Sequence, residues 1–214
     1  MKTVVGALVL AWLLAGCAAT RSTLDVPVTQ APPPPTRGFV RLTEVKDVRR
    51  FEAAPSNPSV PSLQNPQDIG NASITSRAVA RKRGGFGQAM ADILLPEGRT
   101  VEQLVREAAT RALAERGYAV VDEKSPQSGK ALPLQIDIQQ FWSWFSPGFL
   151  QISLEFEGIL GLKGDVLSGG KEEKVRGYGV YKGMVATDSE WQEVLRLGIA
   201  DLIEKMKASI KPAD

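Results

Sequence analysis

Two stretches of alternating apolar and polar residues, on either side of a short turn, restrict the fold of this chain more than any other feature. Residues 132–139 read LPLQIDIQ and residues 150–157 read LQISLEFE. Every second side chain in both stretches is apolar, which is the period of a strand with one buried and one solvated face. Ser146, Pro147 and Gly148 between them are turn residues. The sequence therefore predicts an antiparallel β-hairpin in this part of the chain.

Two amphipathic helices are predicted, one before and one after the hairpin. Thr100 and Gln103 form a capping box at the start of the first helix, and Gly117 ends it. The second helix is expected over 189–209, where Ser189 is the cap and Gln192 is its capping-box partner. Each helix has one apolar stripe, so each is expected to pack against a sheet.

Further strands are expected near 38–51, at 118–121 and at 175–185. The last of these contains three glycines, which would let a helix pack close to the sheet. The resulting order is strand, loop, helix, strand, three-stranded meander and helix. Such a chain predicts an α+β fold, in which two helices pack on one face of a largely antiparallel sheet of four to five strands.

The N-terminus has the pattern of a secretory signal. A positive residue precedes the apolar run of residues 4–14, which is too short to span a hydrocarbon core about 30 Å thick. The run ends in residues 14–17, LAGC, which resemble a bacterial lipobox and contain Cys17, the only cysteine of the chain. The resemblance implies cleavage before Cys17 and acylation of this residue. Ala18 next to it favours the outer membrane, on its periplasmic side.

These features divide the chain into three segments. Residues 1–16 are the expected lipoprotein signal peptide, residues 17–37 the lipid anchor and a proline-rich tether, and residues 38–214 a single periplasmic domain. Consecutive prolines favour an extended polyproline conformation, in which twenty residues reach about 60 Å. The domain is therefore expected to lie well away from the lipid.

The composition excludes several kinds of chemistry. The chain has no histidine, and its single cysteine is expected to be acylated, so histidine triads, cysteine nucleophiles and ordinary zinc sites lack their residues. Ser168 and Lys171 match an S-x-x-K pattern, but the glycines between them favour a turn. A net charge of +2 does not indicate a nucleic-acid partner. We therefore expect a non-enzymatic protein without a cofactor or a bound metal ion.

A basic segment is the first candidate binding surface. Positive charge is concentrated beside the glycine-rich stretch 84–87, and a solvated loop is the simpler explanation of it. The alternative hypothesis is an anion-binding site for a phosphorylated lipid, a glycan or an acidic protein surface. The residues of this candidate site are Arg77, Arg81, Lys82 and Arg83.

An aromatic segment at 141–149, FWSWFSPGF, is the second candidate. If the alternation of 132–138 continues, its two tryptophans share the buried face of that strand, and the three phenylalanines lie on the polar face. Such an exposed patch at a hairpin tip needs a cover, from the loop at 52–72, a second subunit or a partner. We predict a partner-binding tip. Its residues are Phe141, Trp142, Trp144, Phe145 and Phe149.

Several features follow one another in an order known from one bacterial family. They are a lipobox, a proline-bearing tether, a helix ending in LAERGYAVV, a strand LPLQIDIQQF, a hairpin and a C-terminal helix. In this order they resemble the YajG-like outer-membrane lipoproteins, roughly over residues 38–208. The resemblance implies an outer-membrane lipoprotein with no catalytic residues to carry over.

The sequence therefore predicts a lipid-anchored binding or assembly module for another envelope component. We expect an envelope protein as the partner, and the sequence is compatible with a homo-oligomer. The alternative is a carrier or chaperone of a lipid or glycan, similar to lipopolysaccharide-assembly components. The apolar hairpin surface and the basic segment would act together in such a carrier.

Overall fold

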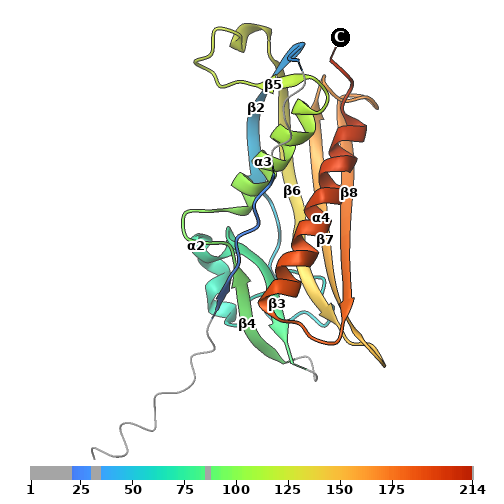
Figure 1. Cartoon of the computed structure of the whole chain (residues 1–214). Coiled ribbons are helices and arrows are strands. Elements are labelled where there is room, and N and C mark those ends of the chain that lie inside the picture. The colour runs from blue at the N-terminus through green and yellow to red at the C-terminus, as the bar shows by residue number, and fades with distance from the viewer. Residues whose placement is uncertain (1–20, 30–34, 85–87, 214) are drawn as a thin grey trace, which may run out of the picture.

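A single mixed β-sheet runs through the centre of the protein (Figure 1). The computed structural model describes residues 21–29, 35–84 and 88–213, so Cys17 and the signal peptide lie outside the described residues. Within the described ranges the sheet has eight strands. They are β1 (Ser22–Thr23), β2 (Gly38–Asp47), β3 (Ala78–Arg83), β4 (Ala89–Leu94), β5 (Tyr118–Val120), β6 (Leu132–Ser146), β7 (Ile152–Gly164) and β8 (Glu172–Gly183).

The predicted sheet of four to five largely antiparallel strands is wrong, although the α+β class holds. The neighbours follow the order β1-β4-β3-β6-β2-β5, and β7 and β8 continue the sheet from β6. The pairs β1–β4, β2–β5, β2–β6 and β3–β6 are parallel, and the other three are antiparallel. Strands β2 and β6 can be parallel because the long connection between them contains a helix. The alternation of apolar and polar residues along a strand identifies its two faces, but it does not identify the strand that pairs with it.

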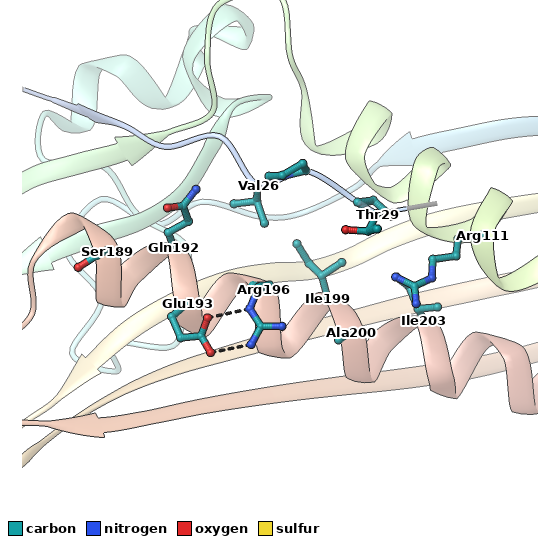
Figure 2. Close-up of a pocket in the computed structure, with 12 residues that line it drawn as sticks. Val26, Thr29, Arg111, Ser189, Gln192, Glu193, Arg196, Ile199, Ala200 and Ile203 are labelled. Atoms are coloured by element: carbon teal, nitrogen blue, oxygen red, sulfur yellow. Dashed lines mark hydrogen bonds and ion pairs between the residues drawn. The ribbon is translucent and has the colours of Figure 1, made fainter. Parts of the chain in front are cut away.

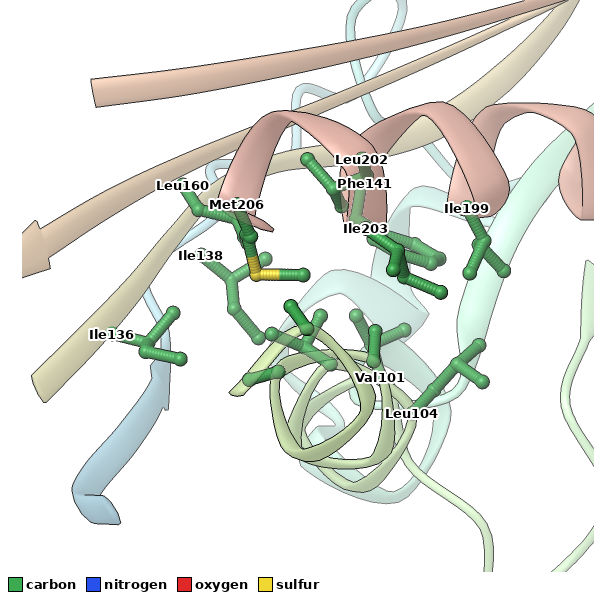
Figure 3. Packing of buried hydrophobic residues seen from close by; sticks show 14 of the residues in the cluster. Val101, Leu104, Ile136, Ile138, Phe141, Leu160, Ile199, Leu202, Ile203 and Met206 are labelled. Atoms are coloured by element: carbon green, nitrogen blue, oxygen red, sulfur yellow. The ribbon is translucent and has the colours of Figure 1, made fainter. Parts of the chain in front are cut away.

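Two long helices lie on one face of the sheet (Figure 1). The helical elements are α2 (Ala72–Thr75), α3 (Val101–Ala114), α4 (Asp188–Ser209) and the short 3-10 helices η2 (Pro66–Gly70) and η3 (Ser128–Lys130). Between α3, α4 and the strands lies the main hydrophobic core. Figure 3 shows Leu104 of α3 facing Ile199 and Ile203 of α4 in this core.

The predicted capping box of α3 is confirmed, whereas that of α4 is wrong. In α3 the Thr100 hydroxyl accepts from the Gln103 amide at 3.2 Å, and the Gln103 side chain accepts from the Thr100 amide at 2.9 Å. In α4 the cap is Thr187, and its partner is Glu190 rather than Gln192. A carboxylate three residues after a threonine is the stronger acceptor for the orphan amide. The side chain of Gln192 instead donates to the carbonyl of Asp25.

Glycines of β8 let α4 approach the sheet closely, as the sequence predicts. A Cβ atom added to Gly179 would lie 2.5 Å from the backbone nitrogen of Gly198 in α4. One added to Gly177 would lie 2.6 Å from the Cα atom of Leu202. Cβ atoms do not approach backbone atoms this closely, so only glycine fits at these two positions.

The long loop between β2 and η2 covers the opposite face of the sheet, beside β3 and β6. It forms a second, smaller hydrophobic cluster there. The buried members are Leu63, Ala78, Leu94 and Trp142, and the partly buried ones are Phe51, Ile69, Ile74 and Trp144. The loop is therefore a structural cover for one part of the sheet.

Arg49 joins this loop to the sheet. Its guanidinium is fully buried and makes two hydrogen bonds with the Asp47 carboxylate, at 2.8 and 2.7 Å. It also donates to three backbone carbonyls at 2.7–3.0 Å, those of Ala78, Phe141 and Thr75. These carbonyls belong to β3, to β6 and to α2. The Arg49 side chain therefore connects the loop to all three elements.

Part of the predicted tether belongs to the folded domain. Within residues 21–29, β1 pairs with β4, and Leu24 and Val26 are buried in the main core. The Leu24 amide donates to the Leu94 carbonyl at 2.9 Å. The boundary predicted at residue 38 is therefore too late. The apolar residues Leu24, Val26 and Val28 alternate, which is a strand-like signal that the neighbouring prolines obscure.

Candidate functional site at the apolar end of the sheet

A β-bulge in β6 decides which aromatic side chains are exposed. The pairing of β6 with β7 shifts between Ile138 and Gln140, so the two faces of β6 exchange from that point on. Phe141 consequently points into the main core, where its ring lies edge-on to Phe156 at 4.9 Å between ring centroids. Trp142 points to the other face. The predicted assignment of faces beyond residue 139 is therefore wrong.

The two tryptophans of β6 belong to the second hydrophobic cluster. Trp142 is 1% exposed, lies edge-on to Phe51 and donates from its indole nitrogen to the carbonyl of Pro58. Trp144 is partly buried against the same cluster. Because Phe141 and Trp142 are both buried, they are unavailable as direct contacts of a partner. The predicted aromatic site is thereby reduced to its outer part.

The outer part of this site forms an apolar end together with a neighbouring loop. We define the apolar end as Phe149 and Leu150 in the β6–β7 turn and Met184 and Val185 in the β8–α4 loop. Phe149 is fully exposed, Leu150 and Met184 are 78% exposed, and Val185 is 54% exposed. Ile152 pairs with Gly183, so the two loops lie next to each other. A fully exposed phenylalanine beside three exposed aliphatic side chains is typical of a contact surface.

Strand β3 ends and β4 begins at the same end of the sheet. Strand β3 is parallel to β6, and Arg83 and Ser146 are the last residues of these two strands. Met90, just after the β3–β4 turn, is 52% exposed. Strand β1 is parallel to β4 and pairs with its last residues, Ile93 and Leu94, so the chain runs into β1 from the direction of the apolar end.

The four basic residues of 77–83 do not form one site. Arg77 donates to the Leu95 carbonyl at 2.9 Å, and Arg83 to the Pro55 carbonyl at 3.3 Å. Lys82 lies toward α4, where its ammonium binds Asp188 at 2.6 Å. Along β3, the side chains of residues 81–83 alternate between the two faces of the strand. Their charges therefore do not converge on a common anion.

Arg81 is the buried member of this set and lies near a buried carboxylate. It is 6% exposed and donates to the Leu63 carbonyl at 3.2 Å. Burial lowers its pKa, and so does nearby Arg83, whereas Asp92 opposes the shift. Burial also raises the pKa of Asp92, although this carboxylate accepts from the Gln64 amide and from Arg21. These groups join the loop and the N-terminal segment to β3 and β4, which is a structural role.

Polar groups of β7, β8 and the turn between them are also engaged in local contacts. Glu155 accepts from the Tyr178 hydroxyl, and burial together with this carboxylate raises the pKa of Tyr178 to about 12. The backbone amide of Tyr178 donates to the Asp201 carboxylate at 2.9 Å. Ser168 and Lys171 lie in the β7–β8 turn, as the sequence predicts. No group of three or more potential metal ligands is present among the described residues.

A groove lies between the N-terminal segment and α4 (Figure 2). Its volume is about 310 Å³. Val26 and Ile199 line it together with the ion pair between Arg196 and Glu193, whose nearest atoms are 2.7 Å apart. Gln192 also lines it, and its side-chain amide donates to the carbonyl of the neighbouring Asp25. The lining mixes apolar, amide and paired charged groups without one dominant chemistry.

The two outer phenylalanines should differ in their effect on stability. Phe149→Ser is expected to leave the free energy of unfolding within about 0.5 kcal/mol of the wild type, because the ring is fully exposed. Phe145→Ser should lower it by about 1–2 kcal/mol, because Phe145 is partly buried against the main core. Urea unfolding of both variants measures the difference. Equal stability of the two variants would contradict the assignment of Phe145 to the core edge.

Comparisons with known proteins give no family for this chain. No family model matches it, and no curated protein is similar to it. One of the solved structures that match this chain is described only as "Crystal structure of uncharacterized protein". It is 12% identical to this chain with a TM-score of 0.47, over 88% of this chain and 97% of that one. Among the described residues, no helix is long and apolar enough to cross a membrane.

Proposed function

We propose that this protein is a non-enzymatic, lipid-anchored module of the bacterial cell envelope that binds another envelope component through its apolar end. One observation carries this proposal. Phe149, Leu150, Met184 and Val185 are exposed side by side, whereas the long loop and the helices bury other large apolar groups of the sheet. Exposed apolar side chains gathered at one end favour a contact surface. The lipobox-like pattern before Cys17 and the adjacent Ala18 support a periplasm-facing position at the outer membrane.

A carrier of a lipid or glycan is supported less well by the geometry. The described grooves include one of about 310 Å³ beside α4 and one of about 610 Å³ beside the loop 48–61. Both have charged residues in their lining, and the space between the helices and the sheet is filled by core side chains. A carrier would need an apolar cavity for acyl chains or a cleft for sugars.

Photocrosslinking in living cells tests the binding module. A photoreactive amino acid is placed at Phe149 or at Met184 in the full-length chain, and at Glu123 as a control. Glu123 is exposed between β5 and β6, at the opposite end of the sheet. We expect light-dependent adducts of defined mass at Phe149 and Met184 and none at Glu123. Absence of adducts at both apolar positions, or equal adducts at all three, would overturn the proposal.

A further inference from the structure

We propose that the apolar end docks on the phospholipid surface of the membrane that holds the lipid anchor, an inference that rests on the proposed anchoring through Cys17. Four peptide steps separate Cys17 from Arg21, the first described residue. A fully extended chain of this length spans at most about 14 Å. The domain is therefore held close to the leaflet, not at the distance that a tether to residue 37 would allow.

The point at which the chain joins the domain is fixed. Arg21 forms ion pairs with Asp68 and with the buried Asp92, and the Ser22 hydroxyl accepts from Lys82 at 2.7 Å. Further along, the guanidinium of Arg99 pairs with the Asp25 carboxylate at 3.2 Å and donates to the Val26 carbonyl. These bonds belong to four separate parts of the fold, so residues 21–26 do not extend the reach of the anchor.

The anchored chain joins the domain from the side of the apolar end. Strand β1 is parallel to β4 and pairs with its last residues, and β4 begins at the end of the sheet where β3 and β6 end. Figure 1 shows the β6–β7 turn and the β8–α4 loop at one end of the molecule. Ser22 pairs with Ile93, four residues after the start of β4, so the chain enters the domain about 13 Å from this end, a distance that the anchor of about 14 Å can span. The leaflet surface can therefore lie against Phe149, Leu150, Met184 and Val185.

The chemistry of this end suits the interface of a phospholipid bilayer. Exposed aromatic and aliphatic side chains on loops can enter the boundary between headgroups and acyl chains. Lys182 is exposed on β8 beside Met184 and can bind an anionic headgroup. The carboxylates nearby are engaged: Asp188 pairs with Lys82, and Glu190 is part of the capping box of α4. The ammonium group of Lys82 thereby offsets the negative charge of Asp188.

Fluorescence of single-cysteine variants tests the docking. Cys17 is the only native cysteine and would be blocked by its acyl chain, so Phe149→Cys or Met184→Cys supplies one reactive thiol. Glu123→Cys at the opposite end is the matched control. The full-length, acylated variants are labelled with an environment-sensitive dye and reconstituted into vesicles of phosphatidylethanolamine and phosphatidylglycerol. Mass spectrometry of the intact proteins verifies acylation before labelling.

We expect dyes at positions 149 and 184 to be protected from aqueous iodide several-fold better than the dye at 123, and to be quenched by nitroxide-labelled phospholipids. Equal iodide quenching at the three positions would overturn the docking. If cellular crosslinking at Phe149 then gives a protein adduct, the binding module stands and its partner is a protein. Chains purified from bacterial membranes without acylation at Cys17 would overturn both the docking and the anchor on which the proposed function depends.

Discussion

Replacement of Arg49 by methionine is expected to lower the free energy of unfolding by about 3–5 kcal/mol, the usual cost of removing one partner of a buried ion pair. The variant leaves the Asp47 carboxylate without its buried partner and three backbone carbonyls without their donor. Methionine fills much of the same volume, so the loss of stability comes mainly from the missing hydrogen bonds and ion pair of Arg49. The midpoint of thermal unfolding should fall by roughly 10 °C.

Arg50→Met is the matched control for this prediction. Arg50 is the next residue, and it is exposed, so its replacement should change the midpoint by no more than about 2 °C. The midpoint of Arg49→Lys should lie near that of Arg49→Met. A single ammonium group lacks the planar arrangement of donors with which a guanidinium binds a carboxylate and several carbonyls together. Calorimetry of the three variants measures the ranking. Similar midpoints for Arg49→Met and Arg50→Met would show that the Arg49 bonds add nothing to stability.

Gly179→Ala is expected to cost about 3 kcal/mol, because one added methyl group would be forced against the backbone of α4. Its Cβ atom would lie 2.5 Å from the nitrogen of Gly198 and 2.8 Å from the carbonyl oxygen of Val194. Neither backbone atom can move alone, so α4 has to shift along much of its length. Urea unfolding monitored by tryptophan fluorescence reports this loss, since Trp191 in the first turn of α4 is buried.

Gly129→Ala separates close packing from the general effect of adding a methyl group. A Cβ atom at Gly129 meets no atom within 4 Å, and the residue lies in η3 on the surface. Its replacement should leave stability unchanged or raise it slightly, because alanine restricts the unfolded chain more than glycine does. A Gly179→Ala protein as stable as Gly129→Ala would mean that α4 does not approach β8 as closely as described.

Local features of the fold could be predicted from the sequence because neighbouring residues determine them. The capping box at Thr100 depends on one residue three positions away, and the hairpin β6–β7 depends on alternation and a turn. Glycines in a strand indicate close packing in the same way. The parallel pairing of β2 with β6 was missed because it depends on a crossover of many residues, which no short pattern encodes.

The candidate site was predicted only in part. Most of the error in the assignment of faces comes from Gln139, the residue of β6 that has no pairing partner in β7. The prediction extends the alternation of β6 past Ile138, but the bulge before Gln140 exchanges the faces. Phe141 thus becomes a core residue while Phe149, beyond the strand, is exposed as expected. The loop at 184–185 was missed because it becomes part of this surface only through the pairing of β7 with β8.

The bond between the Tyr178 amide and the Asp201 carboxylate affects how this protein behaves at high concentration. Strand β8 pairs only with β7 among the described strands, so its outer rim is a free edge of twelve residues. Free edges of this length invite strands of other molecules to extend the ladder, which leads to aggregation. Asp201 occupies the donor in the middle of this edge and adds a negative charge there. The helix that covers the sheet thus also protects its rim against self-association.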